Sequence, residues 1–204
     1  MSPDHEAKPP SPWDRFLKEL DALLRERVEV HCIGGFVVRL FYGLPRPTGD
    51  VDYYAVLPYQ CENDLQKWAG PESMLAKKYK LHLHHFTAIS LPENYATRLV
   101  EMYPGRFEHL CLYALDPYDL ILSKLERNGQ KDRDDVGFLA GSLHLSRELL
   151  CERYRQELRP YLTNESRRDL TPKLGSTLVS KGIRLNSKEK KAPSTRQHKR
   201  VPDA

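Results

Sequence analysis

Two aspartates separated by one residue are the clearest candidates for chemistry in this sequence. Asp50 and Asp52 belong to the stretch DVDYYAV, whose apolar and aromatic residues predict a strand. Side chains alternate between the two faces of a strand, so both carboxylates are expected to point the same way. They repel one another unless a cation lies between them, and such oxygen ligands suit Mg²⁺ or Mn²⁺ carrying the phosphates of a nucleotide. The alternative is a strand end that is simply solvated.

A pair of glycines precedes the two aspartates. Gly34 and Gly35 follow an apolar stretch that ends at Ile33 and predicts a buried strand, and they open a short apolar helix that ends at Gly43. The first N–H groups of a helix are free and the helix dipole is positive there, so this turn can hold a phosphate if no side chain blocks its approach. An ordinary tight turn is the alternative interpretation.

A third group of charged residues lies further along the chain. Lys124 falls one turn after Leu120 on a helix predicted up to Arg127, close to its apolar side, where an ammonium group needs a partner. A surface lysine is the alternative. Asp132 and Asp135 fit the start of the next helix, with Asp132 as N-cap and Asp135 at the third helical position. Nucleotide binding, and a charge network that joins Asp135 to Lys124 or Arg127, remain open.

The order of these motifs resembles a known superfamily. Gly-Gly, a short helix and Asp-x-Asp on the next strand, followed by DLILSKLER and then KDRDDV, is similar to the nucleotidyltransferase superfamily in its minimal, DNA polymerase β-like form. The later pattern resembles small bacterial nucleotidyltransferase-like proteins formerly called a domain of unknown function, which are relatives of the AbiE-type toxin nucleotidyltransferases. The resemblance covers about Val28 to Tyr161.

This resemblance implies a role for each candidate residue. Asp50 and Asp52 are expected to bind the metal and to be catalytic, and Lys124 is expected to be catalytic and to contact the nucleotide's phosphates. The implied nucleotide-binding residues are Gly34, Gly35, Lys124, Asp132 and Asp135.

The implied reaction is Mg²⁺-dependent transfer of a nucleoside monophosphate from a nucleoside triphosphate to an acceptor hydroxyl. The resemblance suggests an RNA such as tRNA, or a protein, as acceptor. It also suggests a toxin of a toxin–antitoxin system, with a cognate antitoxin as partner.

The strand predicted over Leu81 to Phe86 lacks the third carboxylate that many polymerase β-like enzymes carry. His82 and His84 occupy the corresponding face of that strand. This departure leaves a second interpretation open, in which the protein binds a nucleotide or a partner without catalysis. The two histidines also suit two ligands of a tetrahedral zinc site, but no convincing further ligands lie near them in the sequence.

The remaining pattern predicts the elements that position these residues. A helix is expected to start with Ser11 as N-cap, Pro12 at the first helical position and Asp14 completing the cap. Residues 92–103 have helical spacing, and residues 107–115 alternate as a strand. We therefore expect an α/β (α+β) fold, with a small mixed β-sheet flanked by helices and a helical C-terminal portion.

Composition indicates one domain with two appendages. The 204 residues, 40% of them hydrophobic, are enough for a single core. We expect a disordered N-terminus over 1–10, a domain over 11–162 and a basic disordered tail over 163–204. The net charge of +4 arises from this tail, because Thr171 to Ala204 holds nine Lys or Arg against two acids. Non-specific attraction to RNA or DNA is its functional interpretation.

No apolar run approaches the ~20 residues that a membrane span needs, and the first residues lack the apolar segment of a signal peptide. We therefore expect a cytoplasmic protein that does not contact a membrane. The four cysteines, Cys32, Cys61, Cys111 and Cys151, form no C-x-x-C pair, which favours reduced, buried thiols over a zinc or redox site.

Overall fold

The structure is a computed structural model that describes residues 8–87, 89–127 and 129–162. The predicted terminal segments, 1–10 and 163–204, lie outside the described residues apart from residues 8–10. In the described part, no helix is long and apolar enough to cross a membrane. The four cysteines are free thiols; Cys32 is buried as predicted, whereas Cys61, Cys111 and Cys151 are only partly buried.

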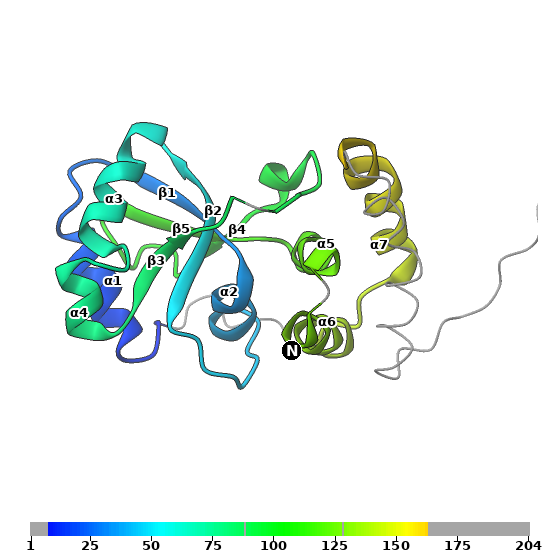
Figure 1. Cartoon of the computed structure of the whole chain (residues 1–204), viewed down its shortest axis with the longest axis horizontal. Coiled ribbons are helices and arrows are strands. Elements are labelled where there is room, and N and C mark those ends of the chain that lie inside the picture. Colours follow the sequence, from blue (N-terminus) through cyan, green and yellow to red (C-terminus); the bar gives the residue numbers. More distant parts are fainter. Residues whose placement is uncertain (1–7, 88, 128, 163–204) are drawn as a thin grey trace, which may run out of the picture.

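A five-stranded mixed sheet forms the centre of the molecule (Figure 1). Its strands run in the order β3-β2-β1-β5-β4. The central strand β1 pairs antiparallel with β2 and parallel with β5, while β2 and β3 are parallel and β4 and β5 antiparallel. The bounds are β1 Val28–Cys32, β2 Asp50–Leu57, β3 His82–His85, β4 Val100–Met102 and β5 Leu110–Ala114. The predicted α/β fold with a mixed sheet is confirmed.

Helices lie on both sides of this sheet in Figure 1. The helices α1, α3 and α4 gather on one side, and α5, α6 and α7 lie beyond the other, with α2 between them and the sheet. The bounds are α1 Trp13–Asp21, α2 Gly34–Leu40, α3 Glu62–Ala69, α4 Met74–Tyr79, α5 Pro117–Arg127, α6 Gln130–Ser142 and α7 Arg147–Arg153. The predicted helical C-terminal portion is therefore present as α5 to α7.

The face of the sheet toward α1, α3 and α4 carries the main core. In β2, the buried residues Val51 and Tyr53 point to this side, where the Tyr53 hydroxyl accepts a hydrogen bond of 2.6 Å from Gln66 of α3. Because side chains alternate along a strand, Asp50 and Asp52 are left on the opposite face. Their predicted common direction follows directly from the burial of their apolar neighbours.

The helix expected from the spacing of residues 92–103 is wrong. Residues 92–103 form a short 3-10 helix, Tyr95–Arg98, and then strand β4, where Met102 pairs with Leu112 of β5 and is buried. Strand pairing at the sheet edge therefore overrides the helical spacing.

The cap of α1 also differs from the prediction. Pro12, not Ser11, occupies the N-cap position, and no side chain caps the helix. Asp14 instead accepts hydrogen bonds of 2.8 to 3.0 Å from Arg106. Partial burial opposes ionisation of Asp14, but the hydrogen bonds and charge of Arg106 outweigh it and lower the pKa of this carboxyl below its usual range.

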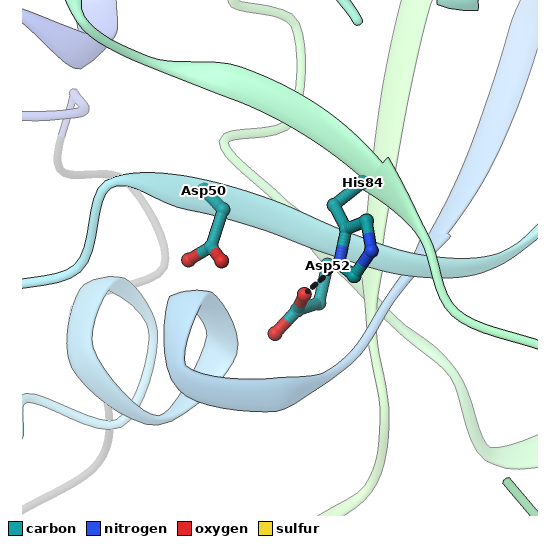
Figure 2. Close-up of side chains that lie close together, drawn as sticks. All are labelled: Asp50, Asp52 and His84. Atoms are coloured by element: carbon teal, nitrogen blue, oxygen red, sulfur yellow. Dashed lines mark hydrogen bonds and ion pairs between the residues drawn. The ribbon is translucent and has the colours of Figure 1, made fainter. Parts of the chain in front are cut away.

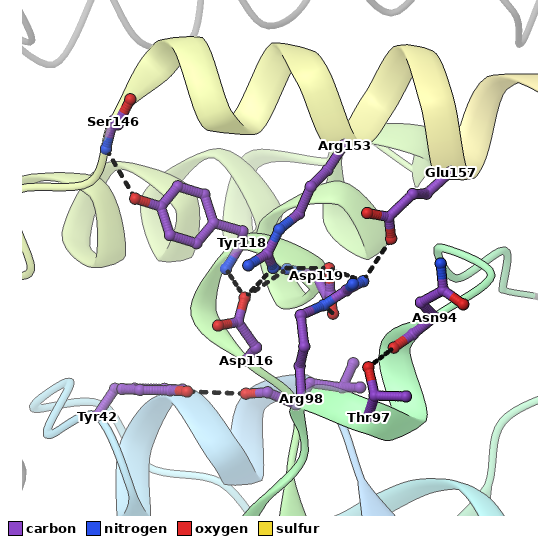
Figure 3. Close-up of polar contacts among 11 residues, drawn as sticks. Tyr42, Asn94, Thr97, Arg98, Asp116, Tyr118, Asp119, Ser146, Arg153 and Glu157 are labelled. Atoms are coloured by element: carbon purple, nitrogen blue, oxygen red, sulfur yellow. Dashed lines mark hydrogen bonds and ion pairs between the residues drawn. The ribbon is translucent and has the colours of Figure 1, made fainter.

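A second group of ion pairs connects the sheet region to the C-terminal helices (Figure 3). Arg98 donates two hydrogen bonds, of 2.8 and 3.1 Å, to the fully buried Asp119 of α5 and one of 2.7 Å to Glu157. Arg153 of α7 bonds to Asp119 and to Asp116. Burial raises the pKa of Asp119, and Arg98 opposes that rise. This network fixes α5 and α7 relative to the segment before β4.

Candidate active site

The two aspartates of β2 meet a histidine from the neighbouring strand (Figure 2). In the parallel register Asp52 pairs with His84 of β3, so their side chains share one face of the sheet. His84 Nδ1 lies 3.1 Å from Asp52 Oδ1. Asp50, Asp52 and His84 each offer one ligand atom within 4.8 Å of the others, and in the described part of the chain no other group of three such residues does so.

The group is open enough to bind a ligand from solution. The side chain of Asp52 is 19% exposed and that of His84 is 46% exposed. Thr48, in the loop before β2, donates a hydrogen bond of 2.9 Å to Asp50 Oδ1 and thereby orients that carboxylate. These are hard oxygen donors with one nitrogen donor beside them, a set that can hold a divalent cation. His82 shares the face but is not part of the group, so the zinc pair of histidines does not form.

Gly34 lies directly against Asp52. Its φ is +69°, and a Cβ on this residue would stand only 2.2 Å from Asp52 Oδ2. The adjacent Ile33 N–H donates a hydrogen bond of 2.9 Å to the Asp52 carbonyl. Both the backbone conformation and the space taken by the carboxylate therefore require glycine here.

A buried charge network lies beside Gly35. Arg46 Nη2 donates to both carboxylate oxygens of Asp135, at 2.8 and 2.9 Å, and Lys124 Nζ donates to Asp135 Oδ2 at 2.7 Å. The side chains of Lys124 and Asp135 are only 3% and 1% exposed. Asp132 Oδ1 is 3.8 Å from Lys124 Nζ. Asp135 thus pairs with two cations: Lys124, as in the charge-network interpretation of the sequence, and Arg46, which that interpretation did not name.

The prediction that Asp132 is the N-cap of α6 is wrong. The helix begins at Gln130, and Asp132 Oδ2 accepts a 3.2 Å hydrogen bond from the Gly129 N–H. Asp132, not Asp135 as predicted, is therefore the third residue of the helix, and it performs the reciprocal half of a capping box.

The predicted site residues thus form two groups with Gly35 between them. Asp50, Asp52 and Gly34 lie together, and Lys124, Asp132 and Asp135 form the buried network. A Cβ on Gly35 would stand 3.3 Å from Arg46 Nη2 and 3.5 Å from Thr48 Oγ1. Arg46 and Thr48 therefore connect the two groups.

Sequence reasoning missed both connecting residues. They stand in the loop LPRPTGD, where neither spacing nor periodicity distinguishes a functional arginine or threonine from an ordinary loop residue. Arg39 of α2 holds this loop in place by donating a hydrogen bond to the Arg46 carbonyl.

The contact between Gly34 and Asp52 predicts the effect of adding one methyl group. Gly34→Ala is compared with Gly43→Ala, because Gly43 also has a positive φ, +83°, but would place its Cβ in open space. The backbone strain, about 1–2 kcal/mol, is common to both variants. We expect Gly34→Ala to lower the free energy of unfolding by at least about 1 kcal/mol more, because Asp52 must move. Urea denaturation of both variants measures this difference, and equal losses would show that Asp52 does not crowd Gly34.

The buried network predicts that removing Asp135 destabilises the fold more than removing Lys124. Asp135→Ala leaves Lys124 and Arg46 without their shared carboxylate and should cost about 3–5 kcal/mol of unfolding free energy. Lys124→Met should cost less, because Asp135 keeps its two hydrogen bonds from Arg46. Denaturant titration compares the two variants. A larger loss for Lys124→Met would contradict the central position of Asp135.

The fold and site agree with one comparison to known proteins. Residues 14–172 match the family described as "Nucleotidyltransferase of unknown function (DUF6036)". Searches of curated proteins and of solved structures return no match. The matched residues include the whole candidate site and most of the chain, which confirms the resemblance to nucleotidyltransferases. The chain belongs to this family of nucleotidyltransferases of unknown function.

Proposed function

We propose that the protein is a divalent-metal-dependent nucleotidyltransferase. It takes a nucleoside triphosphate, transfers the nucleoside monophosphate to an acceptor hydroxyl and releases pyrophosphate. The observation that carries this proposal is the convergence of the Asp50 and Asp52 carboxylates at the glycine turn, on the face of the sheet away from the main core. Membership of a nucleotidyltransferase family supports the same reaction class.

Asp50 and Asp52 are the proposed metal ligands and catalytic residues. These two carboxylates would hold Mg²⁺ or Mn²⁺, which would supply positive charge beside the reacting α-phosphate and the attacking hydroxyl. Nucleotidyl transfer of this kind depends mainly on positioning and electrostatics. Thr48 fixes the Asp50 carboxylate and Gly34 gives Asp52 its space, so the two ligands are held before the metal binds.

The triphosphate is proposed to lie along the turn formed by Gly34 and Gly35. Arg46 lies beside Gly35 and is 32% exposed on its side chain. Both of its bonds to Asp135 use Nη2, so Nη1 remains for a phosphate oxygen. Asp135 contributes to nucleotide binding by holding Arg46, and Lys124 contributes by holding Asp135.

Asp132 contributes indirectly, since it lies near Lys124 and caps the helix that carries Asp135. The acceptor hydroxyl is proposed to belong to an RNA such as tRNA or to a protein. A toxin opposed by a cognate antitoxin is the proposed biological setting. A neighbouring gene for a small DNA-binding protein would support that setting.

Transfer of a labelled nucleotide tests the proposed reaction. The α-labelled nucleoside triphosphates are incubated in turn with total tRNA and with total cell protein, in Mg²⁺ and in Mn²⁺. Asp52→Asn keeps the shape of the side chain but removes a metal-binding charge, so transfer should fall on the order of 100-fold or more. Asp64→Asn is the matched control, because Asp64 is an exposed acid on α3, beyond the other face of the sheet. Equal transfer by wild type and Asp52→Asn would contradict the assignment.

A non-catalytic protein of the same fold is the second candidate function. It is favoured by His84, which stands where a third carboxylate of a two-metal site is expected. This candidate predicts nucleotide binding by the wild type without transfer to any acceptor.

A further inference from the structure

We propose that His84 is the third protein ligand of the metal site and makes that site prefer a first-row transition-metal ion, of which Mn²⁺ is the probe, to Mg²⁺. This inference rests on the metal site of the proposed function and goes beyond it, because it assigns a ligand and a metal preference.

The position of His84 follows from the pairing of two strands. The parallel register of β2 and β3 places Asp52 beside His84 and Asp50 beside His82. Of these two histidines, His84 reaches the carboxylates, since its Nδ1 lies 3.1 Å from Asp52 Oδ1, and His82 is not part of the group. Figure 2 shows the His84 ring directed toward the Asp52 carboxylate from the neighbouring strand.

The ring is exposed enough to exchange its proton for a metal. His84 is 46% exposed on its side chain, and its ring also contacts Phe86 edge to face, with the centroids 5.8 Å apart. Imidazole exists as two tautomers, so Nδ1 can carry either a proton shared with Asp52 or a lone pair for a cation. The cation then takes the place of the shared proton, which moves to Nε2 or to solvent.

The donor atoms determine which ion the site prefers. Mg²⁺ is a small, hard ion that takes oxygen ligands and retains several waters. Imidazole nitrogen is a common ligand of first-row transition metals, and Mn²⁺, which carboxylates also suit, accepts it more readily than Mg²⁺ does. Two carboxylates alone would therefore discriminate weakly, and the nitrogen of His84 provides the preference. The open face of the site leaves the remaining coordination positions to water and to phosphate oxygens.

A positioning role for His84 is the competing explanation of the same contact. If the imidazole only orients Asp52 through a hydrogen bond, its removal should weaken Mg²⁺ and Mn²⁺ binding by similar factors. If it is a ligand, its removal should affect Mn²⁺ far more than Mg²⁺. The ratio of the two dissociation constants therefore distinguishes the explanations.

The experiment measures binding of the metal alone to the full chain. Mn²⁺ is titrated and followed by electron paramagnetic resonance, and Mg²⁺ affinity is obtained by competition. The variants are His84→Ala, His84→Asp and, as matched control, His82→Ala, which removes a histidine from the same strand face. Circular dichroism checks that each variant is folded.

We expect the wild type to bind Mn²⁺ at least about tenfold more tightly than Mg²⁺. His84→Ala should weaken Mn²⁺ binding by about 10–100-fold, because losing a ligand costs at least as much as losing a ligand's partner. His84→Asp should reverse the preference toward Mg²⁺ by supplying a third oxygen donor. His82→Ala should leave both affinities unchanged.

An unchanged ratio of Mg²⁺ to Mn²⁺ dissociation constants in His84→Ala would overturn this inference, and so would the absence of metal binding by the wild type. The result is separable from the proposed function. Selective metal binding without any nucleotide transfer would remove the proposed function and leave the ligand assignment. Metal-dependent transfer with no effect of His84→Ala on metal preference would support the proposed function and remove the ligand assignment.

Discussion

The close approach of Asp52 to Gly34 is the constraint on which the candidate site depends. The carboxylate occupies the space that a side chain on Gly34 would take, and the Ile33 N–H holds the backbone of Asp52. The turn between β1 and α2 is therefore fixed against β2 at the point where the carboxylates converge. Strands β1 and β3 hold β2 from both sides. This frame keeps two mutually repelling carboxylates together, which a flexible loop would not do.

The charges near the site are divided between two environments. Asp50, Asp52 and His84 form a partly exposed group with the donor atoms of a cation site. Arg46, Lys124, Asp132 and Asp135 balance one another in a largely buried network. Buried ion pairs contribute little net stability, but they fix the geometry of the groups that form them. We infer that the buried network fixes Arg46 beside the glycine turn, while the exposed group is left to bind a cation. The network around Asp119 fixes α5, which carries Lys124, in the same way.

Much of the site followed from local pattern. The alternation of DVDYYAV predicted the shared direction of Asp50 and Asp52, because side chains alternate between the two faces of any strand. The pairing of Lys124 with Asp135 was one of the interpretations that the sequence left open. The pairing of Asp52 with His84, the contact of Asp52 with Gly34 and the contact of Arg46 with Asp135 could not be predicted. Those contacts join residues far apart in the chain, and no local spacing encodes them. In residues 92–103 the local pattern predicted the wrong structure. Their spacing is helical, but part of the segment pairs with β5 as strand β4.

Thermal melting with nucleotides tests the central claim most directly. Wild type and the double variant Asp50→Asn/Asp52→Asn are melted with each nucleoside triphosphate, with and without Mg²⁺ or Mn²⁺. A ligand at about a hundred times its dissociation constant adds about 2.7 kcal/mol to the stability of the fold it binds. The account predicts a metal-dependent rise in melting temperature of several degrees for the wild type and none for the double variant. No shift with any nucleotide, or the same shift in both proteins, would contradict a nucleotide site built on Asp50 and Asp52.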